Sequence, residues 1–178
     1  MTPAKPLFEM TAQDLMTRSV VAVPEAMSLR TAAHLLHQSH VSGGPVIDAY
    51  GRCVGVLSAT DFMTIVEKGD DDAKRRTENP GCYHSAWQML DAQELPTDEV
   101  RRFMTDDPVT VSPATPVAEL ARMMVDAHIH RVIVVDGEGR PVGVVSSTDI
   151  LAAVGRAAHV LGERQLVRPG EPGEEVNP

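Results

Sequence analysis

The chain has 178 residues, 43% of them apolar and 23% charged, which suits one compact domain or two small units sharing a core. Its net charge of −9 argues against a general nucleic-acid or anionic-membrane surface, which needs clustered Lys and Arg. No apolar run reaches the ~18–20 residues of a membrane span, and "MTPAKPLFEM" lacks the apolar stretch of a secretion signal. The only cysteines, Cys53 and Cys82, form no metal-type pair and suggest reduced thiols. We therefore expect a cytoplasmic protein.

Residues 1–10 are expected to be flexible, and the first regular element is a short strand within "SVVAV" (19–23) that ends at a proline. Ser28 is a candidate N-cap for a helix with an apolar face at i, i+3, i+4 and i+7. Two strands, "PVID" (45–48) and 53–57, flank the turn "DAYG", in which Gly51 is expected to take a positive φ. A second helix follows over about 60–68. The apolar face of the first helix consists of Leu29, Ala32, Ala33 and Leu36.

Residues 69–98 are longer than a plain connection. The segment starts with polar, turn-forming residues and continues with "CYHSAWQML" (82–90), where apolar residues recur at helical spacing around Trp87. The sequence predicts a linker that contains a helix. This helix has two possible roles: it docks on its own module or its dimer partner, or it contacts another protein.

The same elements recur over 99–162. A strand in "PVTV" (108–111) precedes a helix for which Thr115-Pro116 match the N-cap and N1 preferences. Strands 132–136 and 141–145 flank the turn "DGEG", and a helix follows over about 148–161. The Pro, Gly and Glu content of 163–178 is typical of a disordered tail.

This recurrence is an internal repeat. Shifting the sequence by 88 residues aligns 15–62 with 103–150 without a gap, and 17 of the 48 positions are identical, far more than chance allows. The sequence therefore predicts an α/β (α+β) fold of tandem β-α-β-β-α repeats. Neither repeat alone can bury much core, so the two are expected to pack together through their sheets.

The combination of "HVSGGPVIDAYGRCVGVLSATDF" and "IHRVIVVDGEGRPVGVVSSTDIL" resembles the CBS domain family, named for cystathionine β-synthase. The resemblance makes 11–68 the first CBS motif and 99–162 the second, together forming a CBS pair, or Bateman module, about a pseudo-twofold axis. It also implies two clefts that can hold adenosyl ligands.

Each repeat ends its hairpin with a Ser-x-Thr-Asp sequence at a strand-to-helix junction, with Asp61 in the first copy and Asp149 in the second. A carboxylate at such a junction can accept two hydrogen bonds from the vicinal hydroxyls of a ribose. The resemblance implies this role for the Asp, with the Ser and Thr near the sugar or phosphate. The alternative is that these residues only cap a helix.

The copies differ just before the hairpin, where the second has His130-Arg131 and the first has Ser42-Gly43. A guanidinium and an imidazole suit a nucleotide phosphate. In this respect the second copy resembles the nucleotide-binding repeats of the AMP-activated kinase γ subunit. We therefore expect the Asp149 cleft to favour a phosphorylated adenosine and the Asp61 cleft to be emptier or to take an uncharged group. The alternative is that His130-Arg131 is a solvated charged turn.

The complete set of candidate ligand-binding residues includes apolar positions that the resemblance places near adenine, for which core packing is the competing interpretation. No residue is expected to be catalytic. The set is Asp149, Ser146, Thr148, His130, Arg131, Thr110, Val111, Val132, Ile133, Asp61, Ser58, Thr60, Ala22, Gly44 and Pro45.

The three histidines of the first repeat, His34, His37 and His40, are spaced three apart and would diverge around a helix, so we expect no metal site. His40 and its repeat partner His128 fall back on the apolar face and are expected to be a buried pair at the helix ends.

No nucleophile elbow, P-loop or metal motif is present, so we expect a protein that is not an enzyme and requires no cofactor. The leading hypothesis is a regulatory sensor that binds AMP, ADP or ATP in preference to S-adenosylmethionine or NAD. It would act as a homodimer on an unidentified regulated protein, without nucleic acid or membrane as a partner. The alternative is a scaffold or oligomerisation module with no physiological small-molecule ligand.

Overall fold

The structure is a computed structural model that describes residues 5–69 and 95–165, with side chains described up to Ile65 before the gap and up to Ala158 in the last helix. The tail and most of the linker, including its expected helix, lie outside these residues. The expected β-α-β-β-α order is confirmed in both repeats. The first repeat contains β1 (Val23–Pro24), α2 (Leu29–Gln38), β2 (Gly43–Ile47), β3 (Cys53–Ser58) and α3 (Ala59–Gly69). The second contains β5 (Thr110–Val111), α4 (Val117–Asp126), β6 (Arg131–Val135), β7 (Pro141–Ser146) and α5 (Ser147–Gln165).

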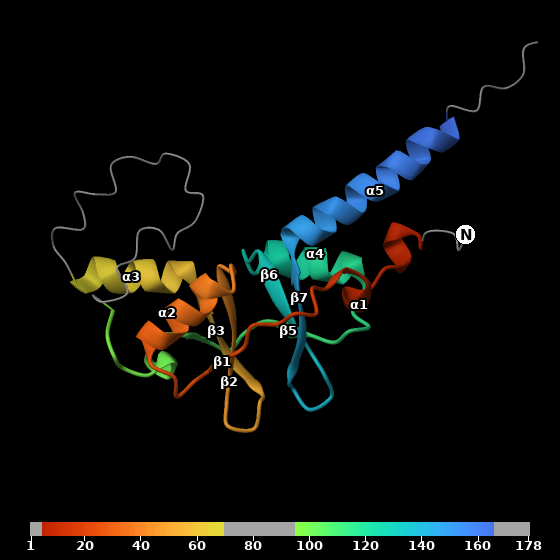
Figure 1. Cartoon of the computed structure of the whole chain (residues 1–178). Helices are drawn as coiled ribbons and strands as arrows, with labels where there is room; N and C mark the ends of the chain where they lie inside the picture. Colours follow the sequence, from red (N-terminus) through yellow and green to blue (C-terminus); the bar gives the residue numbers. More distant parts are fainter. Residues whose placement is uncertain (1–4, 70–94, 166–178) are drawn as a thin grey trace, which may run out of the picture.

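Each half of the molecule contains one sheet, and the two halves lie next to each other (Figure 1). In each half a two-residue strand pairs in parallel with the first strand of the hairpin, β1 with β2 and β5 with β6. The hairpin strands pair antiparallel. Within the described ranges, no helix is both long and apolar enough to cross a bilayer.

Two apolar clusters form the core, one in each half. In the first, the predicted apolar face of α2 packs with the alternate inward residues of β2 and β3 and with Phe62 of α3. In the second, α4 packs in the same way on β6 and β7. The strand and helix periodicities in the sequence therefore point to the residues that are buried.

The two hairpin turns have the expected conformation and touch each other. Gly51 and Gly139 both have φ of 80°, as a turn followed by a bulge requires. The Cys53 N–H donates to the Gly139 carbonyl (2.9 Å), a bond that its repeat partner Pro141 has no N–H to reproduce. The contact between the hairpins is therefore asymmetric.

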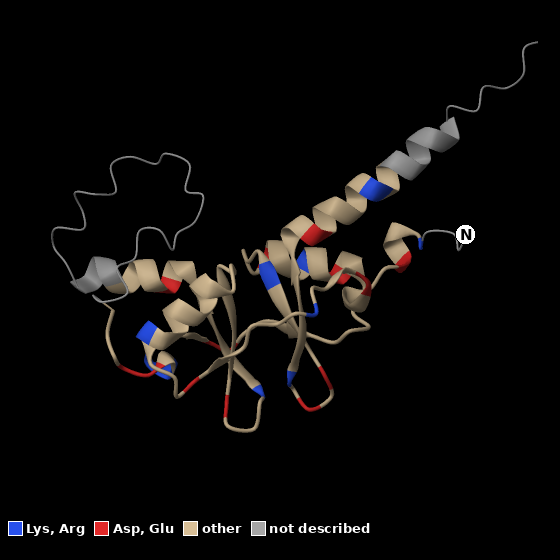
Figure 2. Ribbon diagram, in the orientation of Figure 1, with Lys and Arg blue, Asp and Glu red and all other residues tan. Residues whose placement is uncertain are grey.

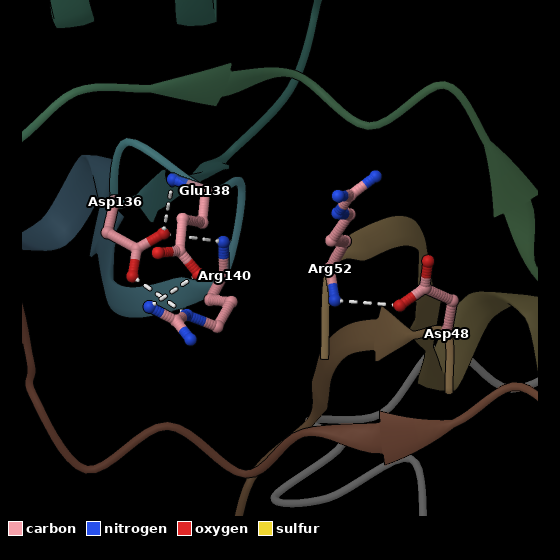
Figure 3. Close-up of polar contacts among 5 residues, drawn as sticks. All are labelled: Asp48, Arg52, Asp136, Glu138 and Arg140. Carbon is pink, nitrogen blue, oxygen red and sulfur yellow. Dashed lines mark hydrogen bonds and ion pairs between the residues drawn. The ribbon is translucent and has the colours of Figure 1, made fainter. Parts of the chain in front are cut away.

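An aspartate stabilises each turn by accepting two backbone N–H groups, and the two turns differ in their arginine side chains. Figure 3 shows Arg140 lying along Asp136 and Glu138, whereas the Arg52 guanidinium extends away from Asp48. The Arg140 backbone N–H and guanidinium hold the pKa of Asp136 below its usual value.

The two halves exchange the segments that precede their first strands. Helix α1 (Ala12–Leu15) comes early in the chain but lies against the second half (Figure 1). The Ala12 N–H donates to Thr115 O (2.9 Å), and Thr17 exchanges two backbone hydrogen bonds with Val144 of β7. A preceding 3-10 helix, η1 (Leu7–Glu9), also contacts α4 and α5, so part of the segment expected to be flexible has defined contacts.

The reciprocal segment, from Leu95 to strand β4 (Thr105–Asp106), packs on the first half. It includes η4 (Val100–Arg102), and the buried Val100 donates its N–H to Met27 O (2.8 Å). Strand β4 then pairs with β3 and completes a four-stranded sheet. Each core therefore contains a segment from the other of the two expected ranges, 11–68 and 99–162.

A strand glycine accommodates each exchanged segment. A Cβ at Gly55 of β3 would lie 2.7 Å from Met104 Sδ, and a Cβ at Gly143 of β7 would clash with Met16. Both glycines and both methionines are repeated in the sequence. In both halves, therefore, a methionine of the exchanged segment packs against a strand glycine.

The second helix of each repeat begins directly after a serine at the N-cap position, Ser58 for α3 and Ser146 for α5. Ser28 caps α2 as expected, accepting from Thr31 N (3.2 Å). In the second repeat the expectation is shifted by one residue, because Pro116 is the N-cap of α4 and not its first residue.

The expectation that His40 and His128 form a buried pair is wrong. His40 and His128 are exposed, and both have φ of 54°, in the left-handed region just past the ends of α2 and α4. His40 N donates to His37 O and Val41 N to Leu36 O, and the same bonds recur around His128. This is a Schellman motif, in which the histidine is the C′ residue and the next apolar residue packs back on the helix.

We predict that His128→Gly raises the free energy of unfolding by about 0.5–1 kcal/mol, because glycine adopts the left-handed conformation without the steric cost of a Cβ. Urea unfolding measures the change. His128→Ala is the matched control and should give no gain, since alanine keeps the Cβ. Equal effects of the two substitutions would contradict the assignment.

Candidate functional site

In both Ser-x-x-Asp sequences the serine donates to the aspartate at the start of the helix, and at α5 the Asp149 N–H also donates back to Ser146 Oγ (3.3 Å). Asp149 Oδ2 accepts hydrogen bonds from Ser146 N (2.8 Å) and Ser146 Oγ (2.6 Å). Asp61 Oδ2 accepts the corresponding bonds from Ser58 N (2.7 Å) and Oγ (2.8 Å). Acidic residues therefore lie in the first turn of both helices (Figure 2). The helix-capping interpretation is correct for one oxygen of each carboxylate.

The second carboxylate oxygen distinguishes the two junctions. Asp61 Oδ1 lies 3.4 Å from Thr105 Oγ1, which β4 brings from the other repeat. Among the residues that the structure describes, none donates to Asp149 Oδ1, although Thr17 is the repeat partner of Thr105. Both aspartates are half-buried, which leaves part of each side chain accessible. Asp149 Oδ1 can therefore accept hydrogen bonds from a ligand.

The His130-Arg131 sequence lies at the start of β6, next to the α5 junction. Arg131 pairs with Ser146 in the strand register, and His130 O accepts from Ser147 N (2.9 Å). Both side chains are exposed. The Arg131 guanidinium donates through Nη2 to Oγ of Ser42, which belongs to the first repeat (2.6 Å). The cation thus lies between the two repeats.

The remaining candidate residues are exposed, half-buried or fully buried. Those with exposed side chains are Thr60, Thr110 and Thr148, whereas Ala22 and Gly44 are half-buried. The buried ones are Pro45, Val111, Val132 and Ile133, and of these Val111 and Val132 belong to the second core cluster. For these two valines the packing interpretation accounts for the side chain.

Two polar residues near the junctions were not identified from the sequence. Thr105 reaches Asp61 through the exchanged segment, and Ser42 reaches Arg131 across the repeats. The only sequence signal for the first was the identity of Thr17 and Thr105 in the repeat alignment. Ser42 differs from its repeat partner His130, so no repeated pattern marked it.

The other candidate clusters do not assemble into a site among the described residues, where no group of three His, Cys, Asp or Glu side chains could hold a metal ion. His34 and His37 are exposed on α2. Cys53 is half-buried, and burial raises the pKa of its thiol.

The sequence pattern of the CBS domain family matches this chain twice, over residues 12–68 and 100–156. The chain belongs to the CBS domain family. Among its relatives is the uncharacterised protein MJ1426 of Methanocaldococcus jannaschii, which is 26% identical over 163 residues. That alignment covers 82% of this chain and 91% of MJ1426.

Solved structures of CBS proteins have the same fold. The complex of CBSX2, a protein of Arabidopsis thaliana, with AMP superposes with a TM-score of 0.63 at 24% identity, covering 84% of this chain and 98% of that one. The cytosolic domain of the Mg²⁺ channel MgtE in complex with ATP gives a TM-score of 0.59 at 29% identity, covering 81% of this chain and 48% of that one. CBS pairs of this fold thus occur with adenine nucleotides bound.

Proposed function

We propose that this CBS pair is a non-catalytic regulatory module of the cytoplasm that binds an adenine nucleotide at the junction of β7 and α5. AMP, ADP and ATP are the favoured ligands. Binding would shift the two repeats relative to each other and so change the surface offered to a regulated protein. The AMP complex of CBSX2 and the ATP complex of MgtE support this ligand class.

The observation that carries the proposal is the unequal use of the two aspartates. Ser146 fixes the Asp149 carboxylate through Oδ2, and no donor among the described residues reaches Oδ1. A carboxylate held in this way can accept both hydroxyls of a ribose without losing its cap. Arg131, directly opposite Ser146 in the sheet, supplies positive charge for the phosphate. Asp61 differs on both counts, because Thr105 Oγ1 lies 3.4 Å from its second oxygen and Gly43 stands in place of the arginine.

The test measures the melting temperature of the full chain with AMP, ADP, ATP, NAD and S-adenosylmethionine. Titration calorimetry then gives the dissociation constant of each compound that raises it. A ligand that binds only the folded state raises the melting temperature as its concentration exceeds its dissociation constant. Asp149→Asn should weaken AMP binding about 10-fold to 100-fold, because hydrogen bonds to a charged carboxylate are lost.

Asp61→Asn is the matched control, since it weakens the same kind of helix cap in the other repeat. It should lower stability as Asp149→Asn does and leave AMP affinity unchanged. Equal losses of affinity in the two variants would contradict the assignment of the ligand to the second repeat. Absence of binding by every compound would overturn the nucleotide function.

A second candidate function is an oligomerisation scaffold, and one observation favours it. Helix α5 exposes Leu151 (68%) and Val154 (43%), one turn apart on the same face. A second copy of the chain covering this face would form a homodimer, which we also propose for the sensor. The scaffold predicts a dimer in light scattering whose melting temperature no nucleotide changes.

A further inference from the structure

The hydrogen bond between Arg131 and Ser42 connects the two repeats at the starts of their hairpins. Ser42 immediately precedes β2, and Arg131 is the first residue of β6. Nη2 of Arg131 lies 2.6 Å from Ser42 Oγ. Both residues are exposed. Without this bond, the long arginine side chain would sample many rotamers in solvent.

The first repeat cannot supply a matching cation. Its residue aligned with Arg131 is Gly43, where a Cβ would lie 2.6 Å from Leu57 O and 2.8 Å from Ser58 Cα. These are backbone atoms of β3, so any side chain at this position would force the sheet apart. The first repeat contributes the Ser42 hydroxyl at this point, and the second contributes the guanidinium. The residues that differ between the copies, Ser42 in the first and Arg131 in the second, therefore bind each other.

We propose that Ser42 is the positioning residue for Arg131 and thereby makes the site prefer phosphorylated adenosine over adenosine. This inference rests on the proposed nucleotide function. Ser42 engages one N–H, and the guanidinium has five, so a phosphate can bind to the others in a bidentate manner. Because the bond to Ser42 already restricts the side chain, less rotamer freedom remains to be lost when the phosphate binds.

The experiment measures dissociation constants of AMP and adenosine by calorimetry for the full chain and its variants. Ser42→Ala should weaken AMP binding about threefold to tenfold, the effect of one side chain that must be ordered on binding. Adenosine has no phosphate, so its affinity should stay unchanged. Ser42→Thr keeps the hydroxyl and should restore AMP binding to within about twofold of the wild type.

A double-mutant cycle with Arg131→Ala separates positioning from a general structural role. In the Arg131→Ala background, Ser42→Ala should have no further effect on AMP. If Ser42→Ala still lowered AMP affinity in this background, or lowered AMP and adenosine affinity equally in the wild-type background, the inference would be overturned. An unchanged AMP affinity in Ser42→Ala while the wild type binds AMP would also overturn it, and in that case the nucleotide function stands. A wild type that binds neither compound overturns both.

Discussion

Replacing Gly44 with alanine is expected to lower the free energy of unfolding by about 3 kcal/mol, the upper end of the usual cost of overpacking. Gly44 lies in β2, where a Cβ would clash with the Val21 carbonyl oxygen in the chain leading to β1. The obstacle is backbone, which no rotamer change can move. The parallel pairing of β1 with β2 would have to shift, and chemical denaturation with urea or guanidinium measures the loss.

Gly155 provides the control for this experiment. It lies in α5, and a Cβ there would meet nothing within 4 Å. Gly155→Ala should therefore raise stability by about 0.5–1 kcal/mol, the helix-propensity gain of alanine over glycine. A destabilisation of similar size in both variants would show that the close approach at Gly44 is not the cause.

Truncation of Phe62 is the second large effect that we expect. This side chain is fully buried in the first cluster, where α3 packs against α2 and β3. Phe62→Ala should lower the free energy of unfolding by about 3–5 kcal/mol, because it removes apolar contacts and leaves a cavity. Equilibrium unfolding followed by circular dichroism measures this change.

The repeat itself supplies the comparison, because Ile150 is the residue aligned with Phe62 and is only half-buried. Ile150→Ala should cost about 1–2 kcal/mol, in proportion to its smaller buried area. If the two truncations cost the same, the packing difference between the halves would be refuted. The first half would then not depend more strongly on its second helix than the second half does.

Local patterns in the sequence were sufficient to identify the elements within each repeat. Alternating apolar residues and the glycines at 51 and 139 specified both hairpins, and the spacing of apolar residues specified α2 and α4. The expectation for His40 and His128 failed for a physical reason. Counting an apolar face beyond Gln38 assumes that the helix continues, whereas the chain turns left-handed at His40 and exposes it.

The exchanged segments could not be predicted, because their pairings join residues between about 50 and 130 positions apart and leave no periodic signal. Ala12 bonding to Thr115 is an example. The contacts between Ser and Asp at the junctions follow from their three-residue spacing at a helix start, and the structure brings them together. The bond from Arg131 to Ser42 depends on the path of one side chain across two repeats, which no alignment of the copies contains.

The exchange also imposes an order on folding during synthesis. When the first hairpin leaves the ribosome, β3 has an open edge, and it stays open until β4 has been made. Helix α1 must likewise wait for β7, more than 120 residues later in the chain. The first half therefore completes its sheet as soon as β4 is made, before β5, β6 and β7 follow in the chain. A chain that stops before Val100 would expose the β3 edge and part of the first core, and is therefore prone to pair with other chains and aggregate.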